Sequence, residues 1–270
     1  MSGVGVQTGH LTLRELRAVL RQPAYIATTL VQPMIWLLLF GQLFGNVTQL
    51  PGFGDGSYVT FMTPGVVIMT ALFTSAWSGM GFIQDMERGV MNRFLVSPTR
   101  PSALLGAKLG YLVVTLTVQT LVVVGAGILT GARYSGGVLG MVVLLVSAIL
   151  LAVAFGSFSN ALALRMRTPE SLIGIANFLV LPLSFLSSAL MAAEAAPGWL
   201  RTVAAYNPVD WAVTASRMAL GVTPAAETDP AVTLTGMLPG IGLRLGGLAI
   251  VALLLAGLAI RAFRSYQRSV

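Results

Sequence analysis

Six stretches of the chain contain no aspartate, glutamate, lysine or arginine, and apolar side chains dominate each of them. They cover residues 22–54, 56–84, 109–132, 134–164, 171–193 and 245–260. A helix needs about 20 mostly apolar residues to cross the hydrocarbon core of a bilayer. The first five stretches reach that length, and the sixth reaches it when Arg244 lies at the boundary and extends its guanidinium outward. The pattern therefore predicts an all-α polytopic membrane protein with six spans, at 24–45, 58–82, 109–130, 138–163, 171–192 and 241–262.

Composition supports this interpretation and excludes a soluble or disordered chain. Hydrophobic residues make up 56% of the 270 residues, charged residues only 9%, and the mean hydropathy is +0.84. Soluble domains carry about 25% charged residues. The apolar run from Ala24 to Phe44 is longer than a signal-peptide core and lacks a small-residue cleavage site, so we expect a retained first span. Without internal repeats or linkers, residues 1–270 are predicted to form one membrane domain.

The net charge of +7 is interpreted as a signal of orientation, because basic residues concentrate in cytoplasmic segments. With the N-terminus inside, most basic residues fall in inner segments: Arg14, Arg17, Arg21, Arg88, Arg93, Arg100, Lys108, Arg165, Arg167, Arg261, Arg264 and Arg268. The outer segments hold Arg133, Arg201, Arg217 and Arg244. We therefore predict that both termini are cytoplasmic, and we expect no nucleic-acid partner.

The sequence offers little chemistry of its own. It contains no cysteine and one histidine, His10, which excludes thiolate and histidine-rich metal sites. The single lysine, Lys108, lies in Gly106-Ala107-Lys108-Leu109-Gly110, which does not match a phosphate-binding loop. The predicted span interiors carry no ionisable residue, which argues against a proton-driven pump or a channel with a charged filter. We expect no cofactor on this chain, and energy for any active transport must come from another subunit.

Residues 10–22 form the first of three informative segments outside the predicted spans. Leucine and valine recur there at helical spacing among basic residues, a pattern typical of an amphipathic helix in the membrane interface. Its basic residues are Arg14, Arg17 and Arg21, which would face anionic lipid. A simple positive-inside anchor is the alternative.

Residues 84–108 form the longest inner connection, and a short amphipathic helix is predicted within 84–98. Met86, Val90, Phe94 and Leu95 would share its apolar face, and the prolines at 98 and 101 would end it. Such a helix suits docking into a groove of a soluble partner, and the alternative is a helix that rests on lipid headgroups.

Residues 194–240 form the longest outer segment. Pro197, Trp199 and the Asn207-Pro208 pair bracket short apolar stretches, and residues 209–220 have a helical pattern. No piece is long enough to span, so we predict short re-entrant helices in the outer leaflet. A surface loop with interfacial tryptophans is the alternative.

Together these segments resemble the permease subunit of ABC-2 type transporters, in particular the drug-resistance exporters similar to daunorubicin permeases. The resemblance covers nearly the whole chain. It rests on Arg21, Pro23, Gln32-Pro33, Trp36 and Phe40-Gly41 near the first span, on Glu87-Arg88-Gly89 followed by Leu95-Val96-Ser97-Pro98, and on Pro197, Trp199-Leu200, Asn207-Pro208 and Arg217. Val90 and Asn92 depart from the family pattern, which often has Thr and Glu there.

The resemblance implies an exporter in the bacterial cytoplasmic membrane, with two permeases and two ATPase subunits that bind ATP and magnesium. It also implies that 84–98 is a coupling helix seated on the ATPase, with 10–22 alongside it. The coupling residues would be Glu87, Arg88, Gly89, Arg93, Phe94, Leu95, Ser97 and Pro98, and the outer segment would be marked by Trp199, Asn207, Pro208 and Arg217.

Uncharged apolar spans suit a hydrophobic or amphipathic cargo, drug-like or lipid. Aromatic, methionine and small polar side chains in three spans are candidates for the substrate pathway, although each could simply serve packing. They are Met34, Trp36, Phe40, Met69, Phe73, Trp77, Asn177, Phe178, Ser184 and Phe185. Export of polysaccharide or glycolipid remains the alternative cargo. A membrane scaffold that docks a soluble partner without transport, and a lipid-acting enzyme, are the alternatives from other classes.

Overall fold

The computed structural model describes residues 3–43, 58–95, 101–190, 196–222 and 234–268, and within these ranges the ordered elements are all helices. Six of them run along the bundle: α2 (Pro23–Leu43), α3 (Tyr58–Ala76), α6 (Pro101–Leu129), α7 (Gly137–Met166), α8 (Pro169–Phe185) and α12 (Leu234–Gln267). The shorter helices are α1 (Val4–Leu20), α4 (Met80–Glu87), α5 (Val90–Leu95), α9 (Gly198–Ala204) and α10 (Pro208–Leu220). The predicted all-α membrane fold is confirmed.

Five of the described helical stretches are long and apolar enough to cross a membrane: α2, the continuous path of α3 and α4, α6, α7 and α12. The predicted span at 171–192 is the exception. Its helix, α8, has 17 residues and ends at Phe185, and the chain continues to Leu190 without regular helix. The fifth predicted span, 171–192, is therefore only partly helical within its described residues.

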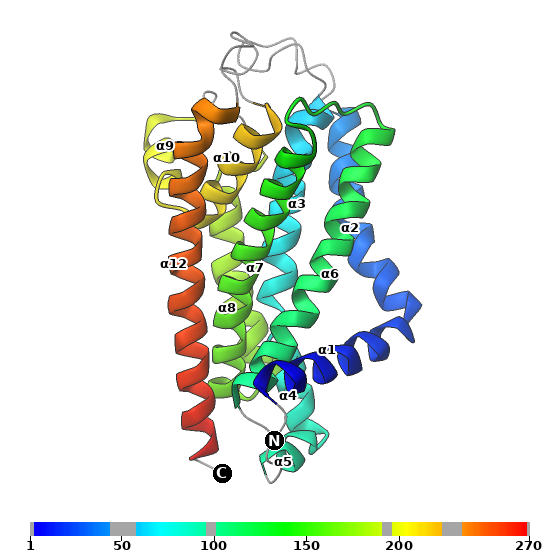
Figure 1. Ribbon diagram of the computed structural model, residues 1–270, viewed down its shortest axis with the longest axis vertical. Coiled ribbons are helices and arrows are strands. Elements are labelled where there is room, and N and C mark those ends of the chain that lie inside the picture. Colours follow the sequence, from blue (N-terminus) through cyan, green and yellow to red (C-terminus); the bar gives the residue numbers. More distant parts are fainter. Residues whose placement is uncertain (1–2, 44–57, 96–100, 191–195, 223–233, 269–270) are drawn as a thin grey trace.

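The shorter helices lie at the two ends of the bundle (Figure 1). Helix α1 lies across one end of the bundle, beside α4 and α5, and both chain termini lie at this end. The helices α9 and α10 lie at the opposite end. We call these the α1 end and the α10 end. Both predicted inner segments therefore share one end, and the predicted outer segment occupies the other.

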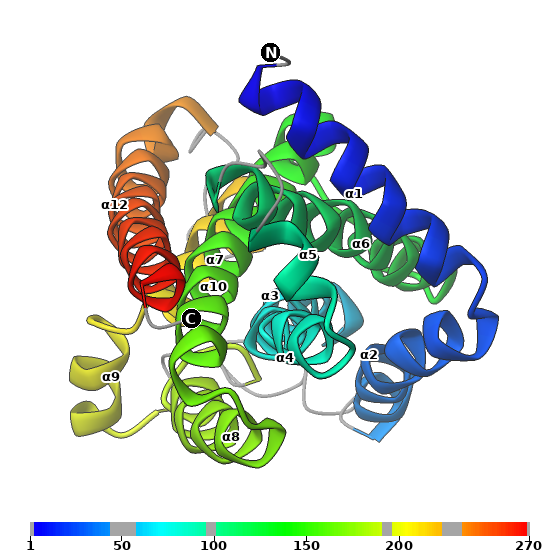
Figure 2. The ribbon, with the colours of Figure 1, turned by 90° about the horizontal axis from the view of Figure 1, so that it is seen from below.

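Helix α7 lies at the centre of the bundle, in contact with α3, α6, α8, α10 and α12 (Figure 2). Its buried side is rich in small residues, among them Gly140, Ala148, Ala152 and Gly156, which allow neighbouring backbones to approach closely. Methyl groups at Gly136 and Gly140 would collide with the carbonyl oxygen of Ala219, at 1.9 and 2.5 Å. The close packing of α10 on α7 therefore requires glycine at both positions.

A turn at residues 77–79 separates α3 from α4, and a side chain of α7 fixes it. The Ser159 hydroxyl donates to the Ala76 carbonyl oxygen at 2.6 Å and accepts from the Gly79 N–H at 3.0 Å. A side chain inserted into the helical hydrogen-bond ladder is a known cause of a kink. A Cβ at Gly79 would lie 2.4 Å from the Ser159 carbonyl oxygen, so only glycine fits there.

Two boundaries at the α1 end differ from the sequence prediction. Helix α1 spans Val4–Leu20, so it begins six residues before the predicted 10–22, and Pro23 is the first residue of α2. The short helix predicted within 84–98 is interrupted, because Gly89 adopts a φ of +68° and separates α4 from α5. Glycine tolerates this left-handed conformation. The prediction that Met86, Val90 and Phe94 share the face of one continuous helix is therefore wrong.

Candidate functional site

The predicted coupling residues up to Leu95 lie on α4, on α5 and in the turn between them, at the α1 end of the bundle (Figure 1). Glu87, Arg88 and Arg93 are exposed. Phe94 is half-buried, and the Arg14 guanidinium of α1 lies 5.1 Å from its ring centre. Such a cation–π contact joins the two predicted inner elements directly. Gly89 forms the break between the helices, Leu95 is described only as the last residue of α5, and Ser97 and Pro98 lie outside the described residues.

Helix α1 is seated on a pair of glycines of α6. Thr8 and Thr12 are one helical turn apart, as are Gly106 and Gly110. A methyl group on Gly106 would lie 3.1 Å from Thr8 Cγ2, and one on Gly110 would lie 2.8 Å from Thr12 Oγ1. This small-residue notch lets α1 approach the backbone of α6 closely. The other two predicted interfacial arginines, Arg17 and Arg21, remain exposed.

Lys108 connects three elements at the same end. Its ammonium group lies 2.8 Å from Asp85 Oδ2 of α4 and 3.2 Å from Glu15 Oε1 of α1, and it donates to the Gly81 carbonyl oxygen at 3.3 Å. The Lys108 side chain is only 9% exposed and lies in the second turn of α6. We call Lys108, Glu15, Asp85 and the Gly81 carbonyl the Lys108 cluster.

Electrostatics favour the ionised form of Glu15 within this cluster. Burial opposes its ionisation, but the opposite charges and hydrogen bonds of Lys108 and Arg14 outweigh burial and hold the pKa of Glu15 below its ordinary value. Arg14 Nη2 donates to the same carboxylate oxygen at 2.9 Å. Charges therefore alternate along the series Arg14, Glu15, Lys108 and Asp85.

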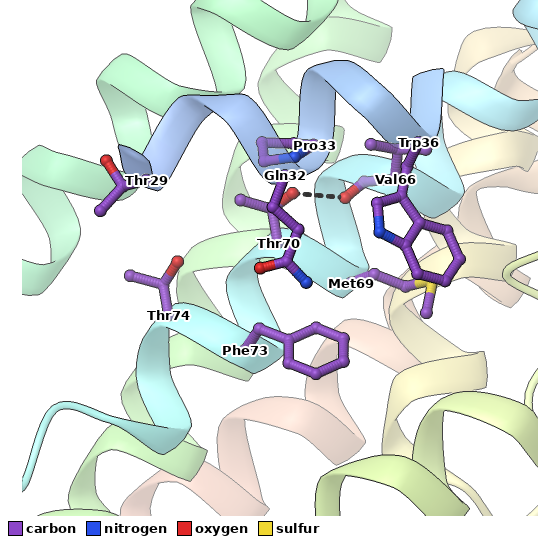
Figure 3. Close-up of a pocket in the computed structure, with 9 residues that line it drawn as sticks. All are labelled: Thr29, Gln32, Pro33, Trp36, Val66, Met69, Thr70, Phe73 and Thr74. Carbon is purple, nitrogen blue, oxygen red and sulfur yellow. Dashed lines mark hydrogen bonds between the residues drawn. The ribbon is translucent and has the colours of Figure 1, made fainter. Parts of the chain in front are cut away.

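An uncharged groove lies between α2 and α3 (Figure 3). Among the predicted pathway residues, Trp36, Met69 and Phe73 line it. Gln32 extends from α2 toward the α3 side chains in Figure 3. The remaining lining residues are Thr29, Gln32, Pro33, Val66, Thr70 and Thr74. The groove thus combines aromatic and thioether surface with hydroxyl and amide groups, a lining suited to a neutral amphipathic molecule.

The other predicted pathway residues lie elsewhere. Phe40 stacks on Trp36 with ring centres 5.3 Å apart, Met34 packs against the core, and Trp77 is exposed at the turn after α3. On α8, Asn177, Phe178 and Phe185 are exposed, whereas Ser184 is buried and donates to the Val180 carbonyl oxygen. Helices α2 and α8 pack on different sides of α3 (Figure 2), so one chain does not bring the two groups together.

Side chains of the outer segment form hydrogen bonds with the end of α8 and with the irregular chain that follows it. The Asn207 amide donates to the Leu183 and Leu186 carbonyl oxygens at 2.8 and 2.9 Å. Asp210 Oδ1 accepts from the Ser188 N–H at 2.8 Å. The buried Arg217 donates to the Ser188 and Ala189 carbonyl oxygens at 2.7 and 3.0 Å and lies 3.7 Å from the Phe61 ring centre. These side chains satisfy the backbone that α8 leaves unpaired.

Two predicted residues of the outer segment have simpler positions. Pro208 is the first residue of α10, where its fixed φ is compatible with a helix start, and Asn207 caps that helix by accepting from the Val209 N–H. Trp199 of α9 is exposed, as expected of an aromatic ring near a membrane interface.

Sequence reasoning missed Lys108 and the polar lining of the groove. Lys108 enters the prediction as an inner basic residue outside any phosphate-binding loop, yet a lone lysine beside an apolar run already suggests a buried cation with partners. The sequence does not show that Gln32, Thr70 and Thr74 line one groove, because Gln32 belongs to α2 and the two threonines belong to α3. Their proximity depends on how α2 packs on α3.

Comparison with known proteins identifies similar sequences. A family model described as ABC-2 type transporter matches residues 6–220. A daunorubicin resistance ABC transporter permease protein of Streptomyces coeruleorubidus is 31% identical over 211 residues, which cover 76% of this chain and 71% of that protein. A putative transport permease of Cyanophora paradoxa is 29% identical over 194 residues, covering 72% of this chain and 67% of that protein. A probable doxorubicin resistance ABC transporter permease protein of Mycobacterium tuberculosis is 24% identical over 213 residues, with coverage of 78% and 74%.

Proposed function

This chain belongs to the ABC-2 type transporter family, and on that premise we propose that it is the permease subunit of an ATP-driven exporter energised by a separate ATPase subunit. The family is one of transport permeases, and this sequence has no phosphate-binding loop of its own. The complex would contain two copies of the ATPase and two of the permease, with ATP and magnesium bound by the ATPase. The α1 end and both termini would face the cytoplasm of a bacterium.

The exposed charges on α4 and α5 are the observation that supports this proposal most strongly. Glu87, Arg88 and Arg93 are solvent-exposed at the end of the bundle where α1 crosses. They offer both signs of charge to a partner, while Phe94 is anchored against Arg14. A surface of this kind can receive a charged groove of an ATPase on one side and transmit its movement to α1 on the other.

The groove between α2 and α3 supports a neutral or weakly polar amphipathic cargo. Among its described lining residues none is charged, and Trp36, Met69 and Phe73 provide an adaptable apolar surface. The relatives named for daunorubicin and doxorubicin resistance agree with a drug-like aromatic compound. A long polysaccharide would need a wide hydrophilic path, and the described groove residues do not favour one.

The exposed face of α8 supports a second permease copy. Asn177 is exposed within this apolar helix, and an amide in lipid would lack hydrogen-bond partners. Its neighbours Phe178 and Phe185 are also exposed. A second copy that packs its own α8 against this face would shelter the amide.

The direct test is co-purification of the permease with an ATPase subunit encoded beside it, followed by an ATPase assay in lipid. We expect a stable complex whose ATP hydrolysis rises severalfold when an anthracycline is added. The matched control is a Trp36→Ala, Phe73→Ala double variant, which should retain basal hydrolysis and lose stimulation. A chain that binds a soluble partner without ATPase activity would support the scaffold alternative and overturn the exporter proposal.

A further inference from the structure

We propose that Lys108 is a positioning residue that joins α1, α4 and α6 into one rigid unit at the α1 end. The proposal starts from the geometry of the Lys108 cluster. Two carboxylates from different helices, Asp85 of α4 and Glu15 of α1, lie 2.8 and 3.2 Å from the same ammonium group of α6. The third hydrogen bond goes to the Gly81 carbonyl, again on α4. All three donors of the lysine are thereby directed to elements other than its own helix.

Helix α4 needs such a connection because a break in the helix separates it from α3, which precedes it in the sequence, and another separates it from α5, which follows it. The turn at 77–79 separates it from α3, and the left-handed Gly89 separates it from α5. Ser159 of α7 fixes the first of these breaks, but without a tie between α4 and α6 a force applied to α5 would not reach α6 directly. Lys108 supplies that tie, with the Phe82 ring 5.7 Å from its ammonium group on the same side.

The cluster also reaches α5 through α1. Arg14 donates to Glu15 at 2.9 Å, and its guanidinium lies 5.1 Å from the Phe94 ring centre. Four side chains of alternating charge thus run from Phe94 to Asp85 and close a loop through α5, α1, α6 and α4. Lys108 is buried, so loss of its carboxylate partners would leave its charge uncompensated, which is strongly unfavourable, and the unit should therefore move as a whole.

The inference for transport rests on the proposed function, since it requires an ATPase that acts on α5. A displacement of α5 would then pass through the Lys108 cluster to α6, and through α4 to α3, which lines the groove. Lys108 touches no cargo and no nucleotide in this account. It sets how much of the movement of the partner reaches the spans.

The first experiment needs the permease alone and tests rigidity. The chain has no cysteine, so spin labels can be placed at Ala18→Cys on α1 and Asn92→Cys on α5, both exposed positions. In lipid we expect a narrow distance distribution between the labels, which Lys108→Met broadens. Arg264→Met, which removes an exposed cation of α12, should leave it narrow. An unchanged distribution in folded Lys108→Met overturns the rigid unit.

The second experiment measures cargo moved per ATP hydrolysed in the reconstituted complex. We expect Lys108→Met to lower this ratio about tenfold while hydrolysis continues, and Lys108→Arg to lose less. A ratio equal to that of Arg264→Met overturns the positioning role. If Lys108→Met does not fold, Asp85→Asn removes only one contact, and the same readouts should shift in the same direction. If the wild-type complex shows no ATP-driven transport, the proposed function fails, and the label distances still decide the rigid unit.

Discussion

The hydroxyl of Ser159 replaces backbone hydrogen bonds where α3 turns into α4, although Ser159 itself belongs to α7. It is 3% exposed, so water cannot compensate for its loss. Ser159→Ala should lower the free energy of unfolding by about 2 kcal/mol, because it leaves one buried carbonyl and one buried N–H unpaired. Thermal unfolding in detergent measures the change.

Ser157 provides the matched control for that prediction. It lies in the same helix, is fully buried, and its hydroxyl has no hydrogen-bond partner within the described residues. Ser157→Ala should therefore change stability little. Equal losses in the two variants would contradict the role given to Ser159.

The ionisation of Glu15 predicts how α1 responds to acid. Because its folded pKa lies below the ordinary value of 4.5, the ionised carboxylate stabilises the contact with Lys108 fully above the unfolded pKa. This stabilisation is lost as the pH falls through the folded pKa. A spin label at Ala18→Cys should therefore stay immobile as the pH falls from 7 to the ordinary carboxyl value of 4.5 and should gain mobility only below it.

Glu15→Gln separates this effect from general acid unfolding. The variant cannot ionise, so its label should be more mobile at neutral pH and should show no transition of its own on acidification. A wild-type transition well above pH 5 would contradict the lowered pKa of Glu15.

At the scale of elements, the seating of α1 depends on glycines of α6 more than on the amphipathic pattern of α1. Gly110→Leu would place a side chain where Thr12 Oγ1 now lies, 2.8 Å from the position of an added methyl group. We expect α1 to detach, with greater label mobility at Ala18→Cys and a severalfold loss of coupled transport.

Gly125→Leu is the control in the same helix, because a methyl group at Gly125 meets no atom within 4 Å among the described contacts. It should leave both readouts near the wild-type values. If Gly110→Leu behaves in the same way, α1 is not held by this notch.

Sequence patterns located most elements because the charge-free runs are a direct consequence of membrane burial. These patterns did not predict the backbone conformation where it depends on contacts with another helix. The end of α8 is irregular because Asn207, Asp210 and Arg217 of the distant outer segment bond its backbone, and no local periodicity records that. The break at Gly89 was readable in principle, since a glycine followed by β-branched Val90 weakens a helix.

At the scale of the whole molecule, the sequence predicted at which end each segment lies, but it did not predict the contacts between helices. The sequence placed α1 and the coupling segment on one side and the re-entrant segment on the other, and the structure separates them accordingly (Figure 1). It could not show that Thr8, Thr12 and Glu15 contact α6, or that only three predicted pathway residues line the groove. Those facts depend on the packing of helices distant in sequence.

The proposed pairing of two permeases predicts a difference between two equally exposed positions. Phe178 of α8 and Leu243 of α12 are each 78% exposed. Phe178→Cys should form covalent dimers with a short bifunctional thiol reagent in the membrane, because it lies beside the exposed Asn177 amide. Leu243→Cys should stay monomeric, because it lies on α12, outside the proposed α8 contact. Equal dimer yields, or the reverse order, would contradict pairing through α8.

The central claim is that ATP hydrolysis by a partner is coupled to transport through the exposed charges of α4 and α5. Cargo moved per ATP in proteoliposomes containing the Glu87→Ala complex tests it most directly. The control is Glu170→Ala, which removes an exposed glutamate from the first turn of α8. The account predicts continued hydrolysis with a ratio about tenfold below the control, as expected when a coupling contact is lost. A Glu87→Ala complex that transports as efficiently per ATP as the Glu170→Ala complex would contradict it.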